Sequence, residues 1–326
     1  MMNPNQSILQ FKKKVVLDNS VGANTINGDD SERFAASILL IALGCELKWG
    51  SRNEDGRKID LLLSYDHPWL YKERMIMLGQ VKSGPTYGAS NKNGFTLLGA
   101  AKVSVKTIVS PMIMFWVDRV KNQLFWAFLH THSTLKPQHY SSIHSVTPAI
   151  RFDLARVQSM LQMTKKGGKG IILKKKSSLL INNRKLAKEC YKQYKMKPLF
   201  SPCFGEIEFS NKSWRQLFRK SRSAKNKEAS LITIPYLDLI LSDLPSKIYV
   251  TSHKYEHHNK STHRLVEYVL HYSQVELYDP ITQSNKKTNV ICRVIEEIVF
   301  PSHWKSIVQI SQLVFRRVNL LSCYYK

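Results

Sequence analysis

Polar residues at the borders of two apolar segments have the types and spacing that hydrolysis requires. Asp60 stands at the start of the apolar run Ile59–Tyr65, and Gln80-Val81-Lys82 ends the next apolar run. Because side chains alternate along a strand, Gln80 and Lys82 point to one face while Val81 points to the core. If the two strands are neighbours and the register allows, Asp60 meets this pair. Glu32, on a preceding apolar segment, could reach the same edge.

These residue types suit metal-assisted hydrolysis of a phosphodiester. Mg²⁺ and Mn²⁺ prefer oxygen ligands, so the candidate metal ligands are Asp60, Gln80 and the backbone carbonyl near Val81. A bound metal polarises the phosphate and lowers the pKa of water, while Lys82 orients that water and balances charge. Since Gln80 is neutral, this site should bind the metal less tightly than a site with two carboxylates would. The alternative is an ordinary strand-end ion pair between Asp60 and Lys82.

Helices and strands alternate along the first part of the chain, and they must position these residues. Asp29, Asp30 and Ser31 are N-cap candidates for a buried helix that ends at Leu43, with Gly44 as the C-cap. A second helix is predicted over Thr96–Val109. The predicted strands are Cys45–Trp49, Ile59–Tyr65, Met75–Lys82, Met112–Val117 and Gln123–Leu129. This order predicts an α/β layered core.

The C-terminal part starts near Ser201 and is predicted to be a second α/β or α+β domain. A helix is expected over Ser213–Arg222, because apolar residues recur at helical spacing along it. Its cations include Arg215, Arg219 and Arg222, which suit phosphate contacts; a plain amphipathic surface helix is the alternative. Thr251–Thr262 carries several histidines but is polar and loop-like, so a surface cluster is favoured over a zinc site.

The charge distribution indicates a polyanionic partner. The formal net charge is +25, and residues 151–200 hold 14 Lys and Arg against 2 Asp and Glu. Nucleic acid is the usual partner of such a surplus, although a solvated linker would also be basic. The candidate phosphate-binding lysines are Lys165, Lys166, Lys169, Lys174, Lys175 and Lys176.

Several segments together resemble the PD-(D/E)XK nuclease superfamily, most closely its Mrr-like branch, in which Gln often replaces the second acid. The segments that carry the resemblance are Gly28–Glu32, the Ala-rich helix that ends at Gly44, Lys58–Leu62, Gly79–Ser83, Pro111–Asp118 and Leu124–Leu129. The resemblance covers roughly residues 28–132 and does not extend to the C-terminal domain.

The resemblance implies a restriction-endonuclease-like core, a mixed sheet flanked by helices, that cuts DNA with Mg²⁺ or Mn²⁺. Carried over by position, Asp60 is the principal metal ligand and Gln80 occupies the position of the second acid. Lys82 is the catalytic lysine, and Glu32 is the helix acid. A role in prokaryotic defence or in a mobile element is implied by resemblance alone.

The sequence thus predicts a metal-dependent DNA endonuclease in four parts. These are a leader (1–28), the nuclease-like domain (29–150), a basic connector (151–200) and a recognition or partner-binding domain (201–326), which could also bind a protein or form a homodimer. No apolar stretch approaches the roughly 20 residues that span a bilayer, so no membrane association is expected. Five widely spaced cysteines without a CxxC pair favour a reducing, cytoplasmic location. The alternatives are a catalytically silent nucleic-acid-binding or scaffolding subunit and an RNA nuclease.

Overall fold

The computed structural model describes residues 21–50, 59–103, 106, 110–163, 170–174, 180–279, 283–307 and 310–326. The chain divides into two compact units. Unit 1 comprises Met1–Asp153 and Phe300–Val314, and unit 2 comprises Leu154–Val299 and Phe315–Lys326. Both units combine helices with β-sheet, so the chain is a mixed α/β protein, as predicted.

Unit 1 is built on a five-stranded mixed sheet with the strand order β1-β2-β3-β6-β7. Strands β3 and β6 are parallel, and the other neighbouring pairs are antiparallel. All five strands were predicted, with bounds that differ by a few residues at most. Their observed bounds are β1 (Glu46–Trp49), β2 (Leu61–Asp66), β3 (Arg74–Ser83), β6 (Met112–Asp118) and β7 (Gln123–Leu129).

Helix α1 (Val21–Leu43) packs on the sheet of unit 1, where it contacts β1, β3 and β6. It ends as predicted at Gly44, which has a φ of +60° and whose N–H donates to the Leu40 carbonyl at 3.0 Å. The predicted start was wrong, because the helix already includes Val21. Asp29 and Asp30 are exposed side chains on its surface and do not cap its N-terminus.

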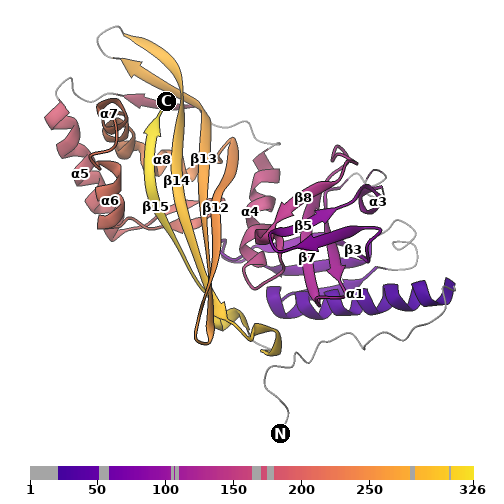
Figure 1. The fold of residues 1–326 in the computed structure, drawn as a ribbon. Helices are drawn as coiled ribbons and strands as arrows, with labels where there is room; N and C mark the ends of the chain where they lie inside the picture. The colour runs from indigo at the N-terminus through magenta and orange to yellow at the C-terminus, as the bar shows by residue number, and fades with distance from the viewer. Residues whose placement is uncertain are drawn as a thin grey trace. The chain divides into compact units, whose positions relative to one another are not determined.

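A three-stranded antiparallel sheet covers the opposite face (Figure 1). It consists of β4 (Gly88–Asn91), β5 (Gly94–Leu97) and β8 (Gln138–Ser141). The Phe95 ring stacks on Trp116 and Phe125 of the larger sheet, with ring centroids 5.9 and 4.9 Å apart respectively. These rings belong to an apolar cluster that joins the two sheets. Leu78 of β3 packs against this cluster.

The predicted helix over Thr96–Val109 is wrong at its start. Thr96 and Leu97 belong to β5, and the helical segment α3 comprises only Gly99–Lys102. Phe95 and Leu97 are both fully buried in the cluster between the sheets, so strand alternation determines the structure here. Of the rest of the predicted helix, residues 104–105 and 107–109 lie outside the part of the chain that the structure describes.

A late segment of the chain completes unit 1. The short 3₁₀ helices η4 (Trp304–Ser306) and η5 (Ile310–Leu313) both contact α1. Trp304 and Ile310 are buried. The N-terminal helix is therefore covered by residues that follow it by more than 250 positions in the sequence, a contact that no local pattern could indicate.

Unit 2 is organised around a sheet of long strands. The order is β12 (Lys247–His258), β13 (Ser261–Asp279), β14 (Ser284–Pro301) and β15 (Phe315–Tyr325). A short strand, β9 (Ile171–Lys174), pairs in parallel with β13. The loop expected over Thr251–Thr262 is wrong, because these residues form the antiparallel hairpin of β12 and β13.

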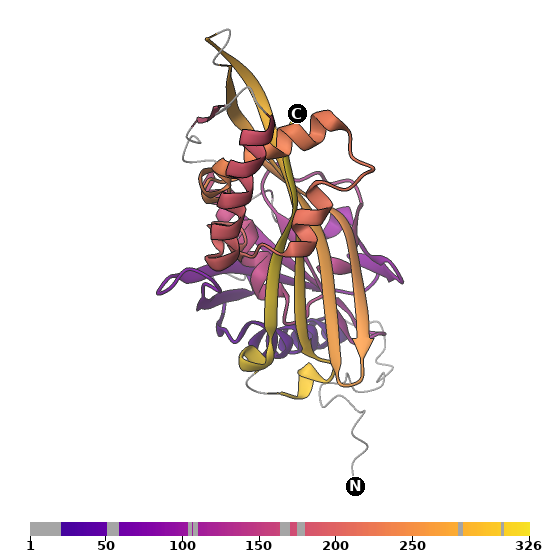
Figure 2. The ribbon, with the colours of Figure 1, turned by 90° about the vertical axis from the view of Figure 1, so that its left-hand side faces the viewer.

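Helices lie on one side of this sheet, in front of the strands in Figure 2. Both α6 and α7 contact β15. The helix predicted over Ser213–Arg222 ends earlier, at Leu217, so Arg219 and Arg222 lie in the turn before α7. The remaining elements that follow the first sheet are α4 (Ile150–Met163), α5 (Leu180–Met196), β10 (Leu199–Ser201), β11 (Gly205–Ile207), α6 (Asn211–Leu217), α7 (Ala224–Thr233) and α8 (Leu237–Ser242).

A buried ionic cluster lies in the interior of unit 2. The fully buried carboxylate of Glu296 accepts hydrogen bonds from Arg156 and Arg316, each at 2.8 Å, and lies 3.6 Å from Arg264. Burial alone would raise the pKa of Glu296, but the three guanidinium groups lower it to about 2. The charged form of Glu296 therefore stabilises unit 2 over most of the pH range.

We expect Glu296→Gln to destabilise the protein by about 3–5 kcal/mol near neutral pH, because it leaves buried guanidinium groups without their carboxylate. The stabilisation is fully present above the ordinary pKa of 4.5 and is lost as the pH falls toward the folded value of about 2. Urea unfolding of parent and variant at several pH values measures this. The difference in unfolding free energy should shrink between pH 5 and pH 2, and a constant difference would contradict the assignment.

Candidate active site

The register of the first sheet brings Asp60 next to Gln80. Strands β2 and β3 are antiparallel neighbours, with Leu61 opposite Gly79. The Asp60 N–H donates to the Gly79 carbonyl at 3.0 Å, so contact between the two strands extends one residue beyond the paired ladder, to Asp60. The strand adjacency on which the sequence prediction depends is therefore confirmed.

The Asp60 carboxylate also occupies a defined place at the end of β2. Strand β3 continues to Ser83, whereas β2 begins only at Leu61, so β2 offers no ladder partner to the Val81 N–H. The Oδ2 atom of Asp60 accepts a hydrogen bond from this N–H at 2.6 Å. Asp60 is only 7% exposed. The candidate metal ligand Asp60 thus supplies the acceptor that the buried Val81 N–H needs.

Alternation along β3 separates two faces. A Cβ atom at Gly79 would lie 3.1 Å from the Phe115 ring and 3.4 Å from the Leu61 Cβ, so Gly79 faces these residues. Gln80 and Lys82 point to the other face. Leu78, on that same face, packs against the apolar cluster beneath the three-stranded sheet. Gln80 and Lys82 therefore lie at the end of an apolar layer, beside Asp60.

Burial differs between the two polar residues of the Q-x-K segment. Gln80 is fully buried, whereas Lys82 is half-buried. The Lys82 ammonium lies 5.9 Å from the centroid of the Tyr87 ring. With the described residues it forms no ion pair, so the strand-end pair with Asp60 is not formed. Tyr87 was not predicted as a site residue; its only signal in the sequence is its position in the turn directly after β3.

The remaining sequence candidates of unit 1 lie on other elements. Glu32 is half-buried on α1, on the helix side of the sheet. His130 and His132 directly follow β7. Both are exposed beyond the end of β7, where Leu129 pairs with Met112 at the start of β6. They therefore lie toward the opposite end of the sheet from Lys82, which pairs with the far end of β6.

The predicted nucleic-acid-binding residues that can be placed belong to unit 2. Lys174 is exposed on β9, and its ammonium lies 5.9 Å from the Tyr278 ring centroid. Arg215 is exposed on α6, and Arg219 is exposed in the following turn, where Arg222 is half-buried. The other predicted contacts, Lys165, Lys166, Lys169, Lys175 and Lys176, lie outside the described residues.

The donor set at the β2–β3 edge fits a hard divalent cation by type. Asp60 offers a carboxylate and Gln80 an amide oxygen. The Val81 carbonyl points to the same strand edge as its N–H, and hence toward Asp60. Within the described ranges, no group of three or more His, Cys, Asp or Glu residues could hold a metal ion. A site with one carboxylate suits Mg²⁺ or Mn²⁺ with water completing the shell, and it does not suit tightly bound zinc.

Comparisons of the chain with known protein families, curated proteins and solved structures found no match. No helix in the described part of the chain has the length and apolar character needed to cross a membrane. The assignment of the site therefore depends on the geometry of its own residues.

This geometry changes what we expect from substitutions at position 60. The sequence places Asp60 at a strand end, where Asp60→Ala should leave folding largely intact. The bond to the Val81 N–H indicates instead that Asp60→Ala costs about 1–3 kcal/mol, because a buried donor loses its acceptor. Asp60→Asn keeps an oxygen in the same place and should be milder. Thermal unfolding of both variants tests this, and equal midpoints would show that the bond contributes little.

Proposed function

We propose that unit 1 is a divalent-metal-dependent DNA endonuclease with a Q-x-K version of the PD-(D/E)XK site. The observation that carries the proposal is the pairing of β2 with β3, in which Asp60 bonds to Gly79 and Val81 on either side of Gln80, and Lys82 follows Gln80 on the same face. The strand order supports it as well. An N-terminal helix, three antiparallel strands and then a strand parallel to the third provide the mixed α/β framework that the resemblance implies.

Each residue has a distinct task in this proposal. Asp60, Gln80 and the Val81 carbonyl would hold Mg²⁺ or Mn²⁺, and a cation bound there would supply Lewis-acid polarisation of a phosphodiester. Lys82 keeps its ammonium half-exposed beside Tyr87, where it can approach a scissile phosphate and stabilise the charge that develops on it. The apolar layer around Leu78 excludes water from the inner side of the site.

DNA is the proposed substrate because the chain is so strongly basic. With a net charge of +25, the protein attracts polyanions over long distances. Unit 2 carries the exposed cations Lys174, Arg215 and Arg219. In the proposal, unit 2 binds the substrate or a partner, and unit 1 cuts.

A catalytically silent nucleic-acid-binding protein is the second candidate, and one observation favours it. The Asp60 carboxylate already has a structural task at Val81, and Gln80 is fully buried. An Asp that only completes a strand end would look the same. Cleavage assays separate the two candidates, because a silent protein binds DNA without cutting it.

We expect the purified protein to nick or linearise plasmid DNA in Mg²⁺ or Mn²⁺ and to be inactive in excess chelator. Asp60→Asn and Lys82→Ala should each reduce the rate by about a hundredfold or more, because each removes a charge that acts on the transition state. Arg74→Gln is the matched control: Arg74 is exposed at the start of β3, opposite Asp66 and at the far end of the β2–β3 pair from Asp60, and its loss should preserve the rate. Parental cleavage by Asp60→Asn would remove Asp60 from the mechanism. Running the assay on RNA tests substrate choice.

Gln80→Glu tests the metal site without relying on cleavage. The new carboxylate would be attached next to Val81, to which the Asp60 carboxylate is bonded, so like-charge repulsion should make the metal-free variant melt at a lower temperature than the parent. Mg²⁺ or Mn²⁺ should restore that loss, and the metal concentration for half-maximal stabilisation should be lower than in the parent. Differential scanning calorimetry over a metal titration measures both effects. Identical titrations of parent and variant would show that residue 80 does not contact the metal.

A further inference from the structure

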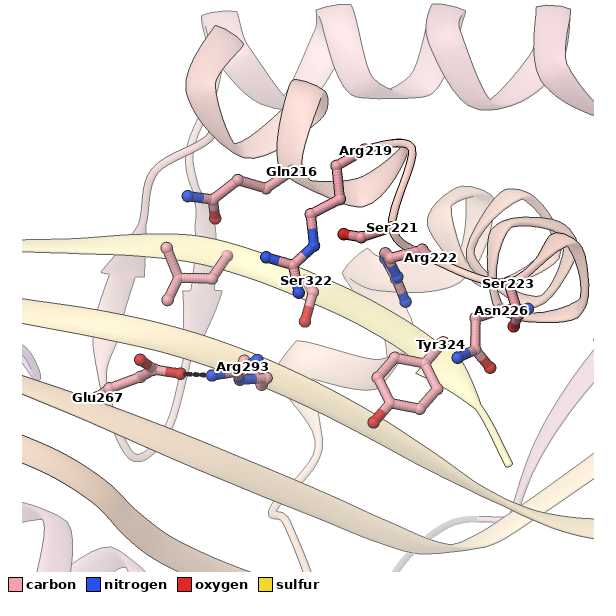
Figure 3. Close-up of a pocket in the computed structure, with 11 residues that line it drawn as sticks. Gln216, Arg219, Ser221, Arg222, Ser223, Asn226, Glu267, Arg293, Ser322 and Tyr324 are labelled. Atoms are coloured by element: carbon pink, nitrogen blue, oxygen red, sulfur yellow. Dashed lines mark hydrogen bonds and ion pairs between the residues drawn. The ribbon is translucent and has the colours of Figure 1, made fainter.

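Unit 2 contains a polar pocket of about 620 Å³ between the turn that precedes α7 and the strands β13, β14 and β15. Its volume is within the range of small-molecule sites, roughly 300–1,000 Å³. Figure 3 shows the Arg219 side chain extending from the turn toward Ser322 of β15. The lining residues are Gln216, Arg219, Ser221, Arg222, Ser223, Asn226, Glu267, Arg293, Leu321, Ser322 and Tyr324.

The charge of this lining is unbalanced. Three arginines face the pocket, and Glu267 is the only acid among the lining residues. Glu267 forms an ion pair with Arg293 (Figure 3). The Arg222 guanidinium lies 5.3 Å from the Tyr324 ring centroid and donates to the Leu217 carbonyl at 2.9 Å. The Arg219 side chain has neither a hydrogen bond nor an ion pair with the described residues. The pocket therefore holds a net positive charge that its described surroundings do not neutralise.

The arginines also act on one another. Burial lowers the pKa of Arg222. Cys323 and Tyr324 act in the opposite direction, and the charges of Arg219 and Arg293 add smaller lowering effects. The arginines therefore repel one another, and an anion between them would relieve that repulsion. The remaining lining consists mainly of hydroxyl and amide groups, with Leu321 as its one aliphatic residue. Such a lining suits a strongly hydrogen-bonding anion and not an apolar ligand.

We propose that this pocket, which we call the Arg219 pocket, binds a phosphate group carried by a nucleotide or by the end of a nucleic acid strand. Guanidinium groups form paired hydrogen bonds with phosphate oxygens. The hydroxyl groups of Ser221 and Ser322 can donate to the remaining oxygens. The volume leaves room for more than a single phosphate. The site lies within unit 2 and is separate from the Asp60 edge, so the inference does not depend on cleavage by unit 1.

Calorimetric titration of the full-length protein tests the pocket directly. Excess chelator is present throughout, so that a metal-dependent site in unit 1 does not contribute. Pyrophosphate and thymidine 5′-monophosphate should bind, and thymidine should not. Arg219→Gln should weaken both interactions by about tenfold or more, because one charge-assisted contact is lost. Lys220→Gln removes the same charge from the neighbouring exposed residue, which does not line the pocket, and should preserve binding.

Two further titrations distinguish the sources of the phosphate. If the ligand is a strand end, a short 5′-phosphorylated oligonucleotide should bind more tightly than its unphosphorylated form, and Arg219→Gln should remove the difference. If the two oligonucleotides bind equally while pyrophosphate and the monophosphate still require Arg219, the ligand is a free phosphate compound. The proposal is overturned if neither pyrophosphate nor the monophosphate binds, if thymidine binds as well as its monophosphate, or if Arg219→Gln and Lys220→Gln weaken binding equally.

Discussion

The hydrogen bond between the Asp60 carboxylate and the Val81 N–H is the contact on which the candidate site depends. Strand β3 continues past the start of β2, and a buried N–H at that point needs an acceptor. Asp60 supplies it and is thereby fixed beside Gln80. The same bond constrains chemistry, because one carboxylate oxygen is already engaged. In the proposed site, Asp60 must accept the hydrogen bond from the Val81 N–H and bind a cation at the same time. The hydrogen bond fixes the position of the carboxylate and leaves less of it available to the metal.

The layers around β3 explain why the polar residues gather at its end and not along its length. Helix α1 contacts one face, and the apolar cluster beneath the small antiparallel sheet reaches Leu78 on the other, so the buried middle of β3 holds apolar side chains, whereas Ile76 nearer its start is exposed. Lys82 is the first position of the Q-x-K segment that reaches solvent. The burial of the Asp60 carboxylate and the Gln80 amide costs free energy that their hydrogen bonds must offset, whereas Lys82 keeps partial access to solvent.

The sequence predicted the large sheet well, because its strands are apolar enough to be recognised individually and Asp60 and Gln80-Val81-Lys82 mark their ends. It failed where distant residues determine the structure. Phe95 and Leu97 belong to a strand because aromatic rings of β6 and β7 receive them, not because of the local pattern. The histidine-rich segment of β12 looks like a loop by composition, yet pairing with β13 makes it a strand. The hydrogen bond between Asp60 and Val81 could not be predicted from the sequence either, because it depends on the offset between the ends of two strands.

The central claim is that Asp60 and Gln80 share a divalent cation, and anomalous diffraction from crystals soaked in Mn²⁺ tests it most directly. The account predicts an anomalous peak about 2.0–2.3 Å from an Asp60 carboxylate oxygen and the Gln80 amide oxygen, with water in the remaining positions. The peak should disappear in Asp60→Asn while the backbone of β3 stays in place. A parental crystal with Mn²⁺ elsewhere and no peak at this edge would contradict the claim, and Asp60 would then be a purely structural residue.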